Sequence, residues 1–185
     1  MDYDVIIIGA GPGGIYAAYE LTKESRGLTV AVFEAGNELH KRKCPIDGEK
    51  IKTCIGCENC SIMSGFGGAG AFSDGKYNIT NDFGGTLYEY IGKEEAIRLM
   101  EYVDSINMSH GGEGTKLYTT ANSTFKKICL QNKLQLLDAS VRHLGTDINY
   151  IVLENLYDEL KYKVDFRFRT PVKSMGLTDG GYRVV

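Results

Sequence analysis

Near the start of the chain stands Val5-Ile6-Ile7-Ile8-Gly9-Ala10-Gly11-Pro12-Gly13-Gly14, an apolar run followed at once by a glycine-rich turn. The apolar run between Tyr3 and Gly9 predicts a strand that is buried on both faces, as strands of a parallel sheet are. A helix is predicted over residues 13–25, and a second apolar strand over Leu28–Glu34. Strand, helix and strand make a βαβ unit with a right-handed crossover, so we expect an α/β fold with a parallel sheet.

The glycines of this turn follow the spacing G-x-G-x-x-G at positions 9, 11 and 14. Gly9 makes the tight turn, Gly11 lets a diphosphate approach the backbone, and Gly14 lets the helix pack closely on the strand. The N–H groups at the start of the helix then bind the diphosphate. Glu34 ends the second predicted strand, where a carboxylate accepts hydrogen bonds from ribose hydroxyls and repels a 2′-phosphate. These residues predict a Rossmann-like site for FAD or NAD and argue against NADP at this position.

A Cys- and Gly-rich segment without regular periodicity covers residues 36–86, and a stretch this long inside a compact domain is usually functional. Its second half reads Ser64-Gly65-Phe66-Gly67-Gly68-Ala69-Gly70-Ala71-Phe72-Ser73-Asp74-Gly75-Lys76. Such a stretch could run beside FAD, because bare backbone approaches a flavin where side chains would clash. Lys76 or a backbone N–H could then stabilise negative charge on the reduced flavin. The alternative is a glycine loop that packs under a lid, with Lys76 merely solvated.

Four of the five cysteines lie between residues 44 and 60, in the pattern C-x2-C-x2-C with a fourth cysteine ten positions earlier. This run is the kind used for a [4Fe–4S] cluster, and four thiolates also suit Zn²⁺. The C-x-x-C spacing equally suits a redox pair that passes electrons from a flavin to a disulfide. Reduced thiols without special chemistry are the remaining alternative. Basic neighbours would lower the pKa of the thiols under either active reading: Lys41, Arg42, Lys43, Lys50 and Lys52.

Helical periodicity returns at Gly92, and we interpret residues 86–163 as a helical insertion. Helices are predicted over about 92–106, from Ser123 and from the N-cap Thr146; strands are predicted over 134–137, 164–168, 172–177 and 182–185. Gly180-Gly181 is a hairpin signal between the last two strands. Cys129 is expected in the core beside Phe125 and Ile128. Because the chain stops inside the last strand, we expect it to be the N-terminal part of a longer protein.

Composition sets outer limits on function. The chain has 185 residues, a net charge of −3, 43% hydrophobic residues and 24% charged residues, as an ordinary globular protein has. The slightly acidic balance gives no general attraction to nucleic acid or to anionic membranes. No apolar run reaches the ~18 residues of a membrane span, and no basic region precedes the first apolar run as in a secretory signal. Clustered cysteines without such a signal favour a cytoplasmic protein.

Four stretches of the sequence together resemble one family: Cys44-Pro45-Ile46, Cys54-Ile55-Gly56-Cys57-Glu58-Asn59-Cys60, Ser64–Lys76 and Arg142-His143-Leu144-Gly145-Thr146-Asp147. They are similar to the bacterial and archaeal NAD(P)/FAD-dependent oxidoreductases, or FAD-dependent dehydrogenases, over essentially the whole chain. The resemblance implies a glutathione-reductase-like flavoprotein of the two-dinucleotide-fold class, with non-covalently bound FAD and a longer chain. It also implies that backbone near Val172 meets the adenine and that Arg42 lies near the adenosine or the diphosphate.

The predicted function is an FAD-dependent oxidoreductase that transfers hydride or electrons through flavin N5, with NAD(P)H as the candidate electron donor and a small-molecule or redox substrate. The alternatives are a flavin-dependent thiol–disulfide reductase and a non-catalytic FAD-binding or electron-transfer module. Lys76 and His143 are the catalytic candidates, and Arg142 either anchors an anionic group or pairs locally. The candidate cofactor-binding residues are Gly9, Gly11, Pro12, Gly13, Gly14, Glu34, Ala35, Arg42, Gly70, Ala71, Ser73, Lys76 and Val172. The candidate ligands of a metal ion or Fe–S cluster are Cys44, Cys54, Cys57 and Cys60.

Overall fold

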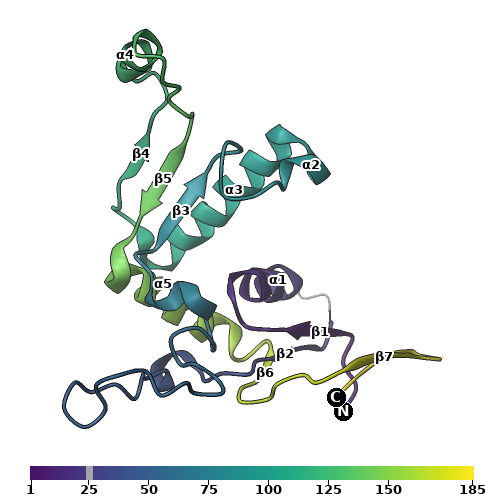
Figure 1. Ribbon diagram of the computed structural model, residues 1–185. Coiled ribbons are helices and arrows are strands. Elements are labelled where there is room, and N and C mark those ends of the chain that lie inside the picture. Colours follow the sequence, from purple (N-terminus) through teal and green to yellow (C-terminus); the bar gives the residue numbers. More distant parts are fainter. Residues whose placement is uncertain (24–26) are drawn as a thin grey trace. The chain divides into compact units, whose positions relative to one another are not determined.

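The computed structural model describes residues 1–23 and 27–185 (Figure 1). The chain divides into two compact units. Unit 1 consists of Met1–Phe72 and Leu153–Val185, and unit 2 consists of Ser73–Val152. Among the described helices, none combines the length and the apolar character needed to cross a lipid bilayer.

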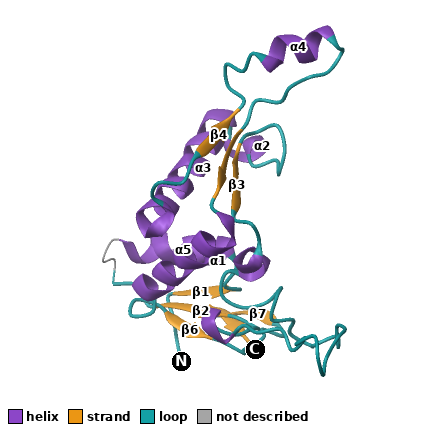
Figure 2. Cartoon of the chain, turned by 90° about the vertical axis from the view of Figure 1, so that its left-hand side faces the viewer, coloured by secondary structure: helices purple, strands orange, loops and turns teal. Residues whose placement is uncertain are grey.

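Unit 1 contains the predicted βαβ unit. Strands β1 (Val5–Ile8), β2 (Val30–Phe33) and β6 (Asp165–Arg167) form one parallel sheet in the order β1-β2-β6. Figure 2 shows the three strands side by side. Helix α1 (Pro12–Lys23) lies between β1 and β2 in the sequence, and the predicted end of this helix at 24–25 falls outside the described residues. The α/β fold with a parallel sheet is confirmed.

One expectation about this sheet is wrong. We predicted that the first strand is buried on both faces, but its first three residues are only half-buried and Ile8 is 54% exposed. In the described part of the sheet β1 lies at an edge, whereas the central strand β2 keeps Val30, Ala31 and Val32 buried. An apolar run shows that a strand belongs to a sheet, but it does not show which strand is central.

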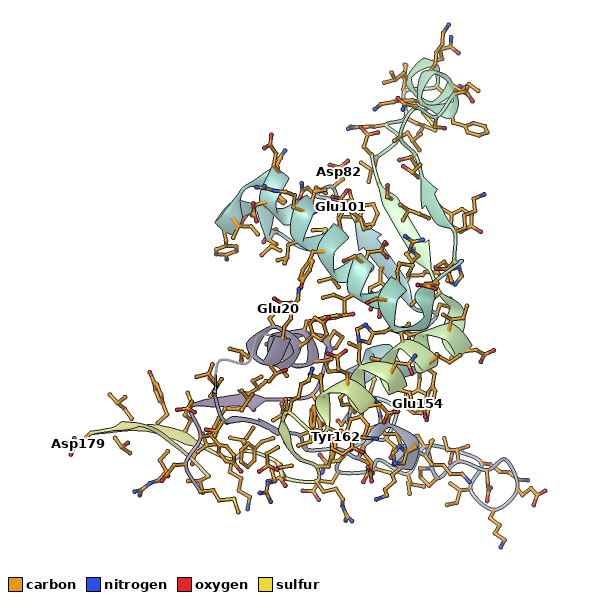
Figure 3. All side chains as sticks on the ribbon, turned by 180° about the vertical axis from the view of Figure 1, so that it is seen from behind. Glu20, Asp82, Glu101, Glu154, Tyr162 and Asp179 are labelled. Atoms are coloured by element: carbon orange, nitrogen blue, oxygen red, sulfur yellow. The ribbon has the colours of Figure 1, made fainter. Side chains whose placement is uncertain are left out.

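The core of unit 1 includes β2 and the buried side chains of two helices. Ile15 and Ala18 on α1 are buried, and Glu20, on the side of α1 turned away from the sheet, is exposed (Figure 3). The C-terminal part of helix α5 (Gly145–Leu160) contributes Leu156 and Leu160, both fully buried. An aromatic cluster joins these elements to the glycine-rich segment: Phe66, Tyr157, Phe166 and Phe168.

The glycine-rich segment of unit 1 ends in a short turn of 3-10 helix. Residues 42–67, all of which are described, form no helix or strand, and they lie between η1 (Leu39–Lys41) and η2 (Gly68–Phe72). At the C-terminal end of the chain, β7 (Met175–Thr178) pairs with β8 (Gly181–Val184), which confirms the hairpin predicted at Gly180-Gly181. The strand expected from Val172 starts only at Met175, so Val172 lies in the preceding loop.

Unit 2 holds an antiparallel sheet in the order β3-β5-β4, formed by β3 (Lys76–Ile79), β5 (Ser140–His143) and β4 (Leu117–Thr119). The helix predicted after Gly92 is α3 (Lys93–Asn107), preceded by α2 (Tyr88–Ile91) and followed by a π-type turn over Met108–Gly112. Two expectations here are wrong. Residues 134–137 form a loop, and helix α4 (Phe125–Gln131) buries no side chain, so Cys129 is not a core residue.

Candidate dinucleotide site and cysteine pocket

The first glycine turn has the geometry that its spacing predicts. Gly9 has φ +96°, a left-handed conformation that favours glycine, and its N–H donates to Phe33 O at 2.8 Å. A Cβ on Gly14 would lie 2.0 Å from Gly9 O, so only glycine allows α1 to pack this closely on the end of β1. Pro12 opens the helix, at a position where its fixed φ is favourable and no N–H is needed.

The space in front of this turn is open within the described residues. A Cβ added to Gly11 or Gly13 would meet no atom within 4 Å. Glycine is therefore not required there by the protein's own packing, in contrast to Gly14. Bare backbone at the N-terminus of a helix, next to open space, is an arrangement that admits an anion.

The second glycine-rich stretch lies directly against the first. Gly67 N–H donates to Ala10 O at 2.8 Å. A Cβ on Gly68 would lie 3.2 Å from Gly11 Cα, and a Cβ on Gly70 would lie 3.8 Å from Pro12 Cγ. The two stretches, far apart in the sequence, thus form adjoining walls at the start of α1.

The Glu34 side chain accepts hydrogen bonds from both glycine-rich stretches. Its side chain is buried, with Oε2 accepting from Ala10 N–H at 2.7 Å and Oε1 accepting from Gly36 N–H at 2.7 Å and Gly65 N–H at 2.9 Å. A carboxylate offers about four lone-pair sites, so about one site is left for another donor. Ribose binding by Glu34 stays a prediction, and the structure adds a backbone-organising role that the sequence did not indicate.

Arg42 has a role different in kind from the one that the resemblance implied. The side chain is buried, and its guanidinium donates to four carbonyl oxygens: Ser61 at 2.9 Å, Ile62 at 2.7 Å, Phe66 at 2.7 Å and Gly68 at 2.8 Å. It also lies over the Phe72 ring, 4.8 Å from the centroid. Burial lowers the pKa of Arg42, while the charges of Glu34 and Cys60 act to raise that pKa. Arg42 therefore shapes the second glycine-rich stretch, and a contact with the cofactor stays a prediction.

Two further close approaches of glycine to backbone, at Gly36 and Gly65, complete this arrangement. A Cβ on Gly36 would lie 2.4 Å from Gly65 N, and a Cβ on Gly65 would lie 2.5 Å from Asn37 O. Their close approach allows both N–H groups to reach Glu34. The signal in the sequence was a glycine two residues after the strand-ending acid, at position 36.

The other predicted cofactor-binding residues fall in different places. Ala35 follows β2 and is half-buried, Ala71 is buried in η2, and Val172 is half-buried in its loop. Ser73 and Lys76 belong to unit 2. The structure therefore brings the glycine turn, Glu34, Arg42 and η2 together in unit 1, while the remaining residues stay predictions.

The two catalytic candidates are neighbours in unit 2. Lys76 on β3 stands directly opposite His143 on β5, and both side chains are exposed. Lys76 Nζ lies 3.0 Å from Asp74 Oδ2, and this contact, with a smaller contribution from His143, lowers the pKa of Asp74. The strands are held in this register by Leu144 N–H, which donates to Gly75 O at 3.0 Å. Lysine, histidine and aspartate thus form one exposed polar cluster.

Arg142 is not available as an anchor for an anionic ligand. Its guanidinium forms a two-point ion pair with Asp104, at 3.0 Å and 2.6 Å, and donates to Thr115 O at 2.6 Å. The two side chains are 12% and 9% exposed, and the hydrogen bonds from Arg142 to Asp104 raise the pKa of Arg142. Of the two alternatives for this residue, the local pairing is the one that the structure shows. The partner, Asp104, was not identified from the sequence.

The four clustered cysteines line one small pocket of unit 1, with a volume of about 90 Å³. All four are free thiols, and the two in the middle, Cys54 and Cys57, are exposed. In the described part of the chain, no group of three or more Cys, His, Asp or Glu side chains is arranged to hold a metal ion. The sequence spacing therefore does bring the four together, but a single metal ion is not supported by their present arrangement.

Comparison with known proteins gives one informative match. Residues 3–54 match the family model described as Pyridine nucleotide-disulphide oxidoreductase. No curated protein matches the chain at a significant level.

Solved structures give only distant likenesses. Glycine oxidase from Bacillus cereus has a TM-score of 0.46 and 13% identity, over 99% of this chain and 53% of its own. THI4 from Thermovibrio ammonificans has a TM-score of 0.42 and 16% identity, over 98% of this chain and 45% of its own. This chain thus spans about half the length of these proteins, and because both TM-scores are below 0.5, the likenesses are too weak to assign a function. The N-terminal segment, residues 3–54, is similar to the pyridine nucleotide-disulphide oxidoreductases, which confirms the expected oxidoreductase resemblance for that part of the chain.

Proposed function

We propose that this protein is an FAD-dependent oxidoreductase and that unit 1 carries its dinucleotide site. The observation that carries the proposal is the bare backbone of Gly11 and Gly13 at the N-terminus of α1, where an added Cβ would meet nothing within 4 Å, with the second glycine-rich stretch packed directly beside it. The oxidoreductase match over residues 3–54 covers the same βαβ unit and supports the same interpretation.

Different residues of this site would bind different parts of an adenine dinucleotide. The free N–H groups at the start of α1 would hold the diphosphate, and the remaining lone-pair site of Glu34 would accept a ribose hydroxyl. Gly70, in the second wall, would allow backbone to lie near the rest of the ligand. The buried negative charge of Glu34 would repel the 2′-phosphate of NADP. When bound, the flavin supplies hydride or single-electron transfer, and NAD(P)H is the proposed electron donor.

We propose that Lys76 stabilises negative charge during the reaction and that His143 transfers a proton. Their positions on neighbouring strands allow the lysine to hold a developing negative charge while the histidine gives or takes a proton. Lys76 lowers the pKa of the Asp74 carboxyl, and the ion pair between the two side chains orients the lysine.

The test is ligand titration of the purified chain with FAD, NAD⁺ and NADP⁺, followed by flavin fluorescence and calorimetry. We expect FAD to bind most tightly. Gly11→Ala adds a methyl group to empty space, so the fold should be kept while FAD affinity falls about tenfold or more. Gly176→Ala is the matched control, because a Cβ there also meets nothing within 4 Å and lies far along the chain, on β7.

Two results would contradict the proposal. The first is equal FAD affinity in Gly11→Ala and Gly176→Ala. The second is the absence of binding by all three dinucleotides. Binding of FAD without its reduction by NADH or NADPH would instead favour the non-catalytic module and would remove NAD(P)H as the donor.

A further inference from the structure

The cysteine pocket has no part in the dinucleotide site, yet the chain is arranged to form it. Cys44 comes from the start of the segment, and Cys54, Cys57 and Cys60 come from its end. The remaining lining is mostly apolar or backbone, from Pro45, Ile46, Ile55, Gly56 and Ser61. Four reduced thiols around one small apolar cavity suit a ligand that prefers sulfur.

A single ion and a cluster place different demands on the positions of the thiols. A Zn²⁺ ion would require all four sulfur atoms to lie about 2.3 Å from the metal. The described residues contain no group converged in this way, although all four cysteines border the same 90 Å³ cavity. An iron–sulfur cluster places its own iron and sulfide atoms between the thiolates, so it suits cysteines that surround a cavity instead of meeting at a point.

The spacing agrees with the cluster. The run C-x2-C-x2-C supplies three ligands of a [4Fe–4S] cluster in bacterial ferredoxin-type sequences, where the cysteine that follows the run ligates a different cluster. The fourth ligand is therefore distant from the run in sequence, as Cys44, ten positions before Cys54, is here. Zinc more often takes two separated C-x2-C pairs, and here the two pairs overlap at Cys57.

Both sides of the pocket are held by hydrogen bonds to the backbone. Between Cys44 and Cys54, Asp47 Oδ1 accepts from the N–H groups of Glu49, Lys50 and Ile51 at 2.9, 2.8 and 2.9 Å. After Cys60, Arg42 donates to the carbonyls of Ser61 and Ile62. The ligand-bearing turns therefore start and end at fixed points.

Basic side chains outnumber acidic ones around the pocket. Residues 41–60 carry five basic side chains and three acidic ones, in a protein whose net charge is −3. Positive neighbours stabilise a cluster that is negative overall when four thiolates ligate it.

We propose that Cys44, Cys54, Cys57 and Cys60 ligate a [4Fe–4S] cluster in this pocket. The cluster adds a one-electron centre to unit 1. The proposal does not depend on FAD, because no residue of the dinucleotide site is among the ligands.

The experiment is anaerobic purification of the full chain and reconstitution with ferrous iron and sulfide. We expect about four iron and about four acid-labile sulfide per chain, and a low-temperature paramagnetic resonance signal after reduction with dithionite. Cys57→Ser and Cys60→Ser should each lose most of the iron and this signal. Cys129→Ser is the control and should keep both, because Cys129 lies on α4 in unit 2.

Three results would overturn the proposal: one zinc per chain without sulfide, a disulfide among the four cysteines without iron, or full iron content in Cys57→Ser. Circular dichroism and FAD titration of each variant separate loss of a ligand from loss of the fold. If a variant unfolds, the iron, sulfide and resonance measurements on the unaltered chain still decide the matter.

Discussion

The glycine turn at residues 9–14 and the cysteine pocket at residues 44–60 are both sites in unit 1, but they are built differently. The glycine turn consists of backbone atoms whose positions are fixed by a strand, a helix and the close contact at Gly14. The cysteine pocket consists of side chains on a stretch without helix or strand, held at its two ends. A backbone site of this kind is complete before its ligand arrives, whereas a side-chain site of the second kind reaches its final geometry with the ligand.

Arg42 holds the residues that follow the cysteine pocket and the second glycine-rich stretch that packs against the glycine turn, so its removal should have the largest effect. Arg42→Ala would leave four carbonyl oxygens of residues 61–68 without their donor, in a largely buried position. We expect a loss of about 3–5 kcal/mol in the free energy of unfolding, measured in urea. Arg98→Ala is the control, because that side chain is 70% exposed and pairs with Glu95 at the surface, so its loss should cost under about 1 kcal/mol.

The more conservative substitution Arg42→Lys separates the charge of Arg42 from the shape of its guanidinium. A lysine keeps the charge but replaces the planar fork with a single ammonium group, so it cannot serve four carbonyls in the same geometry. If Arg42→Ala and Arg98→Ala were equally stable, the guanidinium would not be the anchor of the second glycine-rich stretch.

Gly14 tests the backbone site by itself. Gly14→Ala places a Cβ 2.0 Å from Gly9 O, and neither backbone can yield without separating α1 from β1. We expect a loss of about 2–3 kcal/mol in the free energy of unfolding. Gly13→Ala is the matched control in the same helix, because its Cβ meets nothing within 4 Å and alanine favours helix over glycine, so stability should be kept or slightly raised. Equal losses in the two variants would show that glycine is needed here for another reason.

The sequence predicted the glycine turn well because its information is local. Positions 9, 11 and 14 lie in one short stretch of sequence, residues 9–14. The strand, the turn and the helix follow each other there without interruption. The strands of unit 2 could not be found in this way. Lys76 pairs with His143 and Tyr118 with Val141, so each strand is short, and its pattern depends on partners distant in the sequence.

Arg42 and α4 show two further limits of local information. Nothing near position 42 indicates that the carbonyls of residues 61–68 turn toward it, and the cofactor contact that the resemblance implied for Arg42 stays a prediction. In α4 the helical spacing of Phe125 and Ile128 was read correctly as a helix but wrongly as a core face, since both are more than half exposed. Periodicity reports the local conformation, and burial is decided by what packs against it.

The smallest expected effect is on the cysteine side, at Asp47, and it depends on pH. The N–H groups of residues 49–51 donate to its carboxylate and hold the pKa of Asp47 below the ordinary value of 3.8. A lowered pKa in the folded state means that the hydrogen bonds stabilise the turn above pH 3.8 and are lost as pH falls through the lowered pKa. Amide NMR shifts of residues 49–51 should therefore move together on acidification, with a midpoint below pH 3.8, while the shifts of Gly9 and Gly14 stay constant. Asp47→Asn removes the titrating group but keeps an oxygen acceptor, so it should abolish this joint shift without opening the turn; a joint shift that survives in Asp47→Asn would show that another group holds the turn between Cys44 and Cys54.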